Sequence, residues 1–282
     1  MNHFWSDLES RLASVSRDAP RELSLMSESV TGTPSRLFLL RRLTGDLSDP
    51  SPLQEEELSS LVTRRLAGEP LQYLLGKADF YGRSFAVRPG VLIPRFDTEI
   101  LVDTALSLLK GGESVLDLCA GSGCIGLTVG AEKNVSVTAV EKFDAAFSLL
   151  RENAAAVYPS ARLVQADVFI DSIDGTYDMI LSNPPYIPTS DLSQLSSEVR
   201  NEPHTALDGG DDGLIFYRTI IHRFLSALTP GGILLFECGI GQAAAIEGML
   251  TAAGLRDPIR VRDYGGVERV VGARKPREVS HV

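Results

Sequence analysis

The stretch "SVLDLCAGSGCIGLTVG", residues 114–130, starts as an apolar strand, turns through glycines and continues as a helix. Gly121 and Gly123 allow the backbone to come close to a ligand, and the first turn of the helix would offer free N–H groups. A strand, a glycine turn and a helix in this order are typical of nucleotide-binding α/β folds. We therefore predict a ligand-binding loop formed by Cys119, Ala120, Gly121, Ser122 and Gly123.

Short apolar runs alternate with helical segments on both sides of this loop. We predict strands at residues 114–118, 136–140, 162–165, 178–182 and 232–237. Short strands separated by helices indicate an α/β fold with a mainly parallel, doubly wound, Rossmann-like sheet. "PIRVRDY" (258–264) and "ERVVGAR" (268–274) are close enough in sequence to pair antiparallel at an edge of that sheet.

The first 76 residues lack strand-like alternation and predict a small all-α domain. Thr33 before Pro34 and Ser51 before Pro52 each place a hydroxyl N-cap ahead of a proline that begins a helix. The helix at 52–67 is the best specified, and its charges are explained by a solvated face that complements the helix dipole. The predicted order is a helical domain (1–76), a β-hairpin connector (77–93) and the α/β domain (94–282).

Composition limits the classes of function. The chain has 282 residues, a formal net charge of −10, three scattered cysteines and four scattered histidines. No apolar run approaches the roughly 18 residues of a membrane span, and the first residues, MNHFWSDLES, do not resemble a secretory signal. The negative charge opposes stable binding to nucleic acid. We expect a soluble, cytoplasmic protein with reduced thiols, no metal and no membrane contact.

Acidic residues follow or end successive strands. Asp117 would repel a pyrophosphate but suits the cationic aminoacyl group of S-adenosylmethionine. Glu141 can accept hydrogen bonds from both hydroxyls of a ribose. Asp167 lies where it could bind the amine of adenine, and Val168 could pack on the adenine ring. A single strand-end acid is more often a solvated turn residue. Together these acids predict an S-adenosylmethionine site, with an NAD(P) site as the main alternative.

The segment "SNPPYIP", residues 182–188, forms a stiff corner after the strand at 178–182. Pro185 fixes its own φ and restricts Pro184 to an extended conformation. The Pro184 carbonyl is therefore held in one direction. The Asn183 side-chain oxygen and this carbonyl could together hold the two N–H groups of a planar nitrogen, with Tyr186 against the planar group. We predict that Asn183, Pro184 and Tyr186 are catalytic. The whole motif, residues 183–186, is predicted to bind the substrate, and Asn183 is also predicted to contact the cofactor. The alternative is a simple tight turn.

The combination "LDLCAGSG", "VEK", "ADVF" and "SNPPYI" resembles class I methyltransferases that modify planar nitrogens. Between Gly68 and Lys275, further segments resemble the release-factor glutamine methyltransferase family (PrmC or HemK): "GEPLQYLLGKADFYGRSFAVRPGVLIPRFDTEILVD", "EVRNEPHTALDGGDDGL", "PGGILLFECGIGQ" and "RDYGGVERVVGAR". The resemblance implies a methyltransferase domain at 94–282 and a substrate-recognition role for the helices at 1–76.

This resemblance also implies an activity. The substrate would be the glutamine of a Gly-Gly-Gln loop in peptide chain release factors, methylated on its side-chain amide nitrogen. By resemblance the cofactor loop falls on 119–123, the ribose acid on Glu141, the adenine contacts on Asp167 and Val168, and the amide-binding motif on 183–186.

Two positions depart from the family pattern. The family often has glycine at Cys119 and proline at Phe96, which leaves open whether the backbone at Cys119 has positive φ. Arg95, Asp97 and Glu99 are expected near the methionine end of the cofactor or at the pocket rim. The alternative is a charged helix start capped by Asp97 or Thr98.

Three other functions use the same residues. A ribosomal-protein glutamine could be the substrate, or the corner could hold the amine of adenine in DNA or RNA. A non-catalytic S-adenosylmethionine-binding module is the third. The net charge of −10 favours a protein substrate.

Overall fold

The computed structural model describes residues 3–277, so His281 lies outside the described part. Contacts divide the chain into two compact units. One comprises Met1–Lys77 with Ser196–Asn201, and the other comprises Ala78–Leu195 with Glu202–Val282. Nothing in the sequence pattern indicated that Ser196–Asn201 belongs with the amino-terminal helices.

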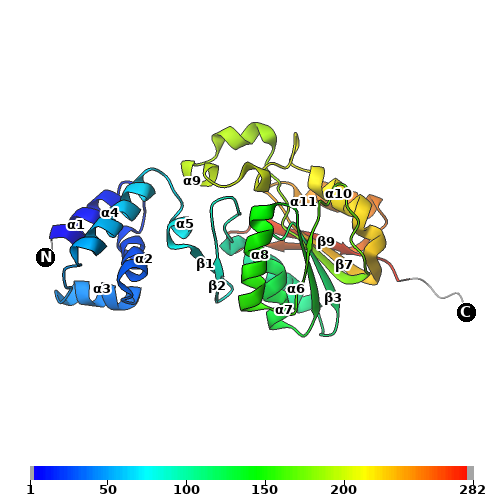
Figure 1. Ribbon diagram of the computed structural model, residues 1–282. Coiled ribbons are helices and arrows are strands. Elements are labelled where there is room, and N and C mark those ends of the chain that lie inside the picture. Colours follow the sequence, from blue (N-terminus) through cyan, green and yellow to red (C-terminus); the bar gives the residue numbers. More distant parts are fainter. Residues whose placement is uncertain (1–2, 278–282) are drawn as a thin grey trace, which may run out of the picture. The chain divides into compact units, whose positions relative to one another are not determined.

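The first unit is helical (Figure 1). Its elements are α1 (His3–Leu12), α2 (Ala19–Thr31), α3 (Ser35–Thr44), α4 (Pro52–Leu66), α5 (Leu71–Leu75) and α9 (Ser197–Arg200). The expected apolar face of α4 is buried, with Leu58 and Val62 fully enclosed. They pack in a core with Trp5 and Phe38, whose rings meet edge to face at 4.9 Å between centroids. This core lets short helices fold that would be marginal alone.

The two proline-marked helix starts have different outcomes. The Ser51 cap is confirmed: its side chain accepts from the Gln54 N–H, and the Gln54 side chain accepts from the Ser51 N–H in return. The Thr33 cap is wrong. Pro34 is the N-cap residue of α3, and the Ser35 N–H instead donates to the Glu28 carboxylate at 2.9 Å. A side chain from the preceding helix thus replaces a local cap.

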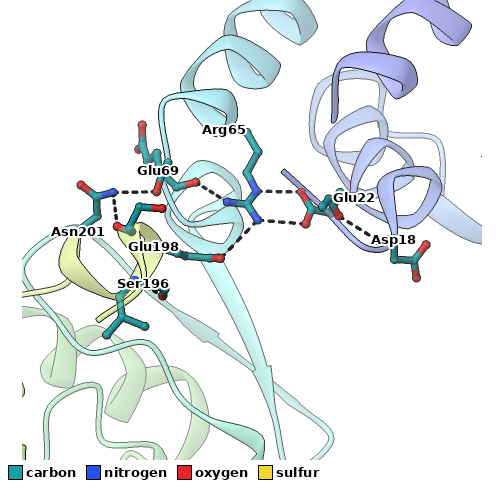
Figure 2. A network of polar contacts seen from close by, with 11 residues as sticks. Asp18, Glu22, Arg65, Glu69, Ser196, Glu198 and Asn201 are labelled. Carbon is teal, nitrogen blue, oxygen red and sulfur yellow. Dashed lines mark hydrogen bonds and ion pairs between the residues drawn. The ribbon is translucent and has the colours of Figure 1, made fainter. Parts of the chain in front are cut away.

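The charges of α4 are not all a solvated face, so that expectation is wrong for Arg65. Its guanidinium donates to both carboxylate oxygens of Glu22 at 2.9 and 3.2 Å, pairs with Glu198 at 3.5 Å and donates to the Glu69 carbonyl (Figure 2). Arg65 is only 6% exposed. Asn201 also donates to the Gly68 carbonyl at 2.8 Å. These contacts hold Ser196–Asn201 against the end of α4.

Arg65→Ala should destabilise the first unit by roughly 3 kcal/mol, because it leaves a partly buried Glu22 carboxylate without its partner. Arg64→Ala is the matched control, since Arg64 is half-exposed and pairs with Glu69, and should cost less than ~1 kcal/mol. Urea unfolding followed by fluorescence of Trp5, the one tryptophan, measures both. Equal losses in the two variants would contradict the role given to Arg65.

The second unit confirms the predicted fold class. Its seven-stranded sheet has the order β5-β4-β3-β6-β7-β9-β8, parallel from β5 to β7, with β9 antiparallel to both its neighbours. The strands are β3 (Ser114–Leu118), β4 (Ser136–Glu141), β5 (Arg162–Gln165), β6 (Tyr177–Ser182), β7 (Leu228–Glu237), β8 (Arg256–Arg262) and β9 (Glu268–Arg274). The predicted antiparallel pairing of the last two strands is therefore confirmed.

Helices cover both faces of this sheet (Figure 1). They are α6 (Glu99–Leu108), α7 (Cys124–Glu132), α8 (Asp144–Val157), α10 (Ile215–Phe224) and α11 (Ala243–Ala252), with short 3₁₀ turns at Phe96–Thr98, Thr189–Gln194, His204–Ala206 and Leu225–Ala227. Alternate strand residues enter different cores: Leu235 packs with α6 and α7, whereas Leu234 packs with α10 and α11. Such near-continuous apolar strands are expected of a parallel sheet covered on both sides.

The predicted hairpin is present as β1 (Lys77–Phe80) and β2 (Arg83–Ala86). The rings of Phe80 and Phe85 pack edge to face, with 6.0 Å between their centroids. Both residues belong to a hydrophobic core of the second unit. Within residues 3–277, no helix has the length and apolar character needed to cross a membrane.

Candidate active site

A cavity of about 300 Å³ lies in the second unit, among residues that follow the carboxyl ends of β3, β4, β5 and β6. Strand order reverses between β3 and β6, and such switch points are where open α/β sheets bind ligands. Predicted residues that line it are Cys119, Ala120, Gly121, Ser122, Glu141, Asp167, Val168, Asn183 and Pro185. Four of the residues predicted to bind cofactor or substrate lie outside the lining: Asp117, Gly123, Pro184 and Tyr186.

The loop after β3 has left-handed backbone at three positions: Cys119 (φ 60°), Gly121 (φ 56°) and Gly123 (φ 82°). The conformation that glycine favours is therefore kept at Cys119, at a cost of roughly 1–2 kcal/mol for a residue with a Cβ. A Cβ at Gly123 would also lie 2.4 Å from Leu150 Cδ1, so a larger residue there would force this leucine to move. The loop thus turns tightly along the cavity wall.

Glu141 is fixed at the end of β4 by backbone donors. Its Oε2 accepts from the Gly121 N–H at 2.9 Å, and its Oε1 accepts from the N–H groups of Lys142 and Phe143. Each carboxylate oxygen can accept more than one hydrogen bond. Glu141 therefore joins two walls of the cavity and keeps acceptor capacity for a ligand hydroxyl.

Asp167 is held by two donors after β5. Its Oδ1 accepts from the Phe169 N–H at 2.9 Å, and its Oδ2 pairs with Lys142 Nζ at 2.9 Å. Burial alone would raise the pKa of Asp167, but these donors outweigh it and the pKa is lowered. Sequence reasoning missed Lys142, which lines the cavity beside Glu141.

Asp117 lies within β3 and is fully buried. Its Oδ2 accepts from the Gly126 N–H in α7 at 2.9 Å, while its Oδ1 has no partner among the described residues. Burial raises the pKa of Asp117 to about 7 in spite of the Gly126 hydrogen bond. The predicted contact with a cationic aminoacyl group stays a prediction, and the unpaired oxygen is an acceptor suited to such a donor.

The Asn183 corner is held from several directions. Asn183 Nδ2 donates to the Thr98 hydroxyl at 3.4 Å, and the Tyr186 carbonyl accepts from Gln242 Nε2 at 2.9 Å. Gln242 Oε1 in turn accepts from the Gly239 N–H. Sequence reasoning gave no role to Gln242 and only a capping role to Thr98. Gln242 does fall within "ECGIGQ", residues 237–242, which carried part of the family resemblance.

Glycines of "LDGGDDGL", residues 207–214, pack directly against this corner. A Cβ at Gly213 would lie 2.4 Å from the Tyr186 carbonyl oxygen, and one at Gly209 would lie 2.8 Å from Tyr186 Cα. The Gly209 N–H also donates to the Ile187 carbonyl at 2.8 Å. The close approach explains the need for glycine at both positions.

The segment "PRFDTE", residues 94–99, serves several purposes. Only Arg95 of the three expected charges lines the cavity, where it pairs with the enclosed Glu202 carboxylate. Asp97 pairs with Arg269 at 3.0 Å, and Glu99 accepts from the Tyr81 N–H. The capping alternative is wrong for Thr98, the N-cap residue of α6, because its side chain makes no capping bond.

Phe96, the second departure from the family pattern, begins the 3₁₀ turn Phe96–Thr98. Its ring is 68% exposed and lies 6.4 Å from the ring of Tyr264. The turn forms although proline is absent.

The glycine loop after β3, the acid at the end of β4 and the Asn-Pro-Pro corner after β6 lie at one edge of a doubly wound sheet. Together they define a class I methyltransferase that uses S-adenosylmethionine. Residues 95–211 match the methyltransferase small domain, and residues 5–76 match the PrmC N-terminal domain. The chain belongs to the release factor glutamine methyltransferase family.

Curated relatives cover most of the chain. A release factor glutamine methyltransferase of Geobacter sulfurreducens is 45% identical over 79% of this chain and 80% of its own length. One of Salmonella typhimurium is 37% identical over 91% and 93%. Among solved structures, a methyltransferase from Pyrococcus furiosus has the same fold, with a TM-score of 0.55 at 20% identity, covering 77% of this chain and 99% of that one.

Gly126→Ala should destabilise the second unit by about 1–3 kcal/mol, because the new Cβ would lie 2.7 Å from Asp117 Oδ2. Gly248→Ala is the matched control: it is helical, a Cβ at this position would point into open space, and the substitution should gain up to ~1 kcal/mol from helix propensity. Chemical unfolding followed by far-ultraviolet circular dichroism compares the two. Stabilisation by Gly126→Ala would refute the close contact.

Asp117→Asn should change how stability depends on pH. The pKa of Asp117 is raised from 3.8 to about 7 in the folded protein, so folding favours the protonated carboxyl. This carboxyl therefore contributes its full stabilisation below pH 3.8, and the contribution is lost as the pH rises to about 7. Relative to Asp117→Asn, the wild-type free energy of unfolding should therefore fall by up to ~4 kcal/mol over that range. Urea unfolding across this pH range tests it, and parallel curves for the two proteins would contradict it.

Proposed function

We propose that this protein transfers a methyl group from S-adenosylmethionine to the side-chain amide nitrogen of the glutamine in the Gly-Gly-Gln motif of peptide chain release factors. The carrying observation is that Asn183 and Pro185 line the same cavity as the loop after β3 and Glu141. Membership of the family supports this substrate, and a cytoplasmic location is proposed together with it.

The cavity residues fit this methyl donor. Bound S-adenosylmethionine supplies an electrophilic methyl group on a sulfonium. Glu141 would accept from the ribose hydroxyls, while Val168 would pack on the adenine ring near Asp167. The loop at 119–123 would hold the methionine part, and the unpaired Oδ1 of Asp117 would accept from its aminoacyl group.

The corner would activate a weak nucleophile by position. An amide nitrogen has its lone pair delocalised, so it attacks poorly unless it is held out of conjugation. Asn183 Oδ1 and the Pro184 carbonyl would accept its two N–H groups, and the adjoining Pro185 restricts the angle of that carbonyl. Correct alignment of two reactants can supply several kcal/mol of the barrier without a strong base.

Tyr186 would contribute a surface rather than a proton acceptor. Burial, followed by the nearby Glu237 charge, raises the pKa of Tyr186 well above its usual range, so the phenol stays neutral. Its backbone is held by Gln242, which fixes the corner from outside the cavity. A neutral aromatic ring can lie against the planar amide of the substrate.

The first unit would hold the release factor. Its match to the PrmC N-terminal domain supports this assignment. The ribosomal-protein and adenine alternatives share the same two acceptors, so substrate assays must distinguish them. The net charge of −10 favours the protein substrates over nucleic acid.

Asn183→Ala should lower kcat for release-factor methylation about 100-fold or more, because one of two preorganised acceptors is lost. Affinity for S-adenosylmethionine should change much less. Radiolabelled methyl transfer and calorimetric binding measure the two quantities, with Asn134→Ala, an asparagine outside the cavity, as control. Equal loss of turnover and cofactor affinity would count against the assigned role.

The substrate is tested in the same assay. A release factor with Gly-Gly-Gln should be labelled, whereas its Gln→Ala form, a ribosomal protein and an adenine-containing oligonucleotide should not. Absence of label on the intact release factor, with label on either alternative, would overturn the proposal.

A further inference from the structure

Arg95 contributes a guanidinium to the lining of the cavity. Its side chain is 39% exposed, and Nη2 donates to Oε1 of Glu202. The other guanidinium nitrogens, Nε and Nη1, have no partner among residues 3–277. A guanidinium carries five N–H donors in a planar fork, so one carboxylate does not use them all. Arg95 therefore has donors for a second acceptor.

Glu202 fixes this guanidinium from behind the cavity lining. Its side chain is fully enclosed and does not line the cavity. Besides the Arg95 side chain, it accepts from the N–H of Ile93, another lining residue, at 3.1 Å. One buried carboxylate thus holds both the arginine and the backbone two residues before it. The side chain is ordered before a ligand binds, which lowers the entropy lost on binding.

Among residues 3–277, two cationic side chains line the cavity, Arg95 and Lys142, and they lie at different ends of it. Lys142 Nζ pairs with Asp167, which follows β5, at 2.9 Å. The Arg95 carbonyl accepts from the Thr98 N–H at 3.1 Å, and the Thr98 hydroxyl accepts from Asn183 Nδ2, which follows β6. Because β4 and β3 separate β5 from β6, Arg95 belongs to the end at the Asn183 corner.

The ligand loop after β3 has few N–H groups to spare for a ligand carboxylate. The Ala120 N–H donates to the Val140 carbonyl at 2.9 Å, and the Gly121 N–H donates to the Glu141 carboxylate. The Gly123 N–H donates to the Ala120 carbonyl at 2.7 Å. These three N–H groups are used within the protein, so a carboxylate in this cavity requires donors from another segment.

We propose that Arg95 binds the α-carboxylate of the methionine part of S-adenosylmethionine, and that Glu202 is the residue that positions its guanidinium. The ammonium and hydroxyl groups of this ligand donate hydrogen bonds and suit the acids of the site, whereas its carboxylate only accepts. A guanidinium can meet a carboxylate with two parallel hydrogen bonds. The inference deepens the proposed function and rests on it for the direction in which the ligand lies.

Two ligands that differ only in this carboxylate test Arg95. In calorimetry, S-adenosylmethionine should bind Arg95→Met about 10-fold to 100-fold more weakly than the wild type, because a charged hydrogen-bond partner is lost. Decarboxylated S-adenosylmethionine should bind both proteins equally. Arg88→Met is the matched control and should change neither affinity, since Arg88 also pairs with a glutamate, Glu152, but lies outside the cavity. Equal weakening of both ligands by Arg95→Met, or of neither, would overturn the proposal.

A double variant keeps the test valid if Arg95→Met unfolds, because that substitution alone leaves the enclosed Glu202 carboxylate unpaired. Arg95→Met combined with Glu202→Gln removes both charges. It should bind S-adenosylmethionine about 10-fold to 100-fold more weakly than the wild type and leave the affinity for the decarboxylated ligand unchanged. Wild-type affinity for S-adenosylmethionine in the double variant would show that the guanidinium is not the binding group.

Glu202→Gln alone tests the positioning role. The guanidinium remains but loses its ionic partner, so S-adenosylmethionine should bind about 3-fold to 10-fold more weakly, the effect of ordering one long side chain on binding. Affinity for the decarboxylated ligand should stay the same, whereas a merely structural role would weaken both ligands. Unchanged or tighter binding of S-adenosylmethionine, or equal weakening of both ligands, would refute the role given to Glu202.

These binding measurements contain no release factor, so they separate this inference from the proposed function. If Arg95→Met weakens only S-adenosylmethionine but the wild type does not methylate release factor, the carboxylate site stands and the proposed substrate fails. If release factor is methylated but the two ligands respond alike to Arg95→Met, the carboxylate site fails and the proposed substrate stands.

Discussion

Parallel pairing of β3 with β6 is the constraint on which the site depends. Its register places Leu118 beside Ser182, and the Ser182 hydroxyl donates to the Leu118 carbonyl at 2.7 Å. The next residues along the two strands are Cys119 of the ligand loop and Asn183 of the corner. Because parallel strands end at the same edge, cofactor and substrate groups meet without any long loop having to bring them together.

Two acidic residues near this edge of the sheet are buried, and burial disfavours the charged form of a carboxyl group. Asp117 and Glu237 are both buried, and burial raises the pKa of each to about 7. Each retains one oxygen without a partner among the described residues. Unpaired buried acceptors weaken a fold, so they are better explained by function than by stability. The large apolar cores on both faces of the sheet compensate for this cost.

Features encoded within a few residues could be predicted from the sequence, and features that depend on distant partners could not. The strands, the glycine loop and the Asn183 corner are local patterns of apolar residues, glycine and proline. By contrast, Arg65 meets a Glu22 that is 43 residues away, and Thr98 meets Asn183 across 85 residues. Helix-start residues such as Thr98 favour capping locally, and only tertiary packing diverts the hydroxyl elsewhere.

Ser196–Asn201 shows why the two sequence regions cannot be treated as independent folding units. The chain enters the first unit at Ser196 and leaves it after Asn201, so Glu202 already belongs to the second. Within the first unit, Glu198 gives Arg65 a second carboxylate beside Glu22. A fragment ending at residue 77 would lack that carboxylate and the Asn201 bond to Gly68. The family match at residues 5–76 therefore covers most of the first unit. It does not include Ser196–Asn201, whose side chains complete the contacts around Arg65 and Gly68.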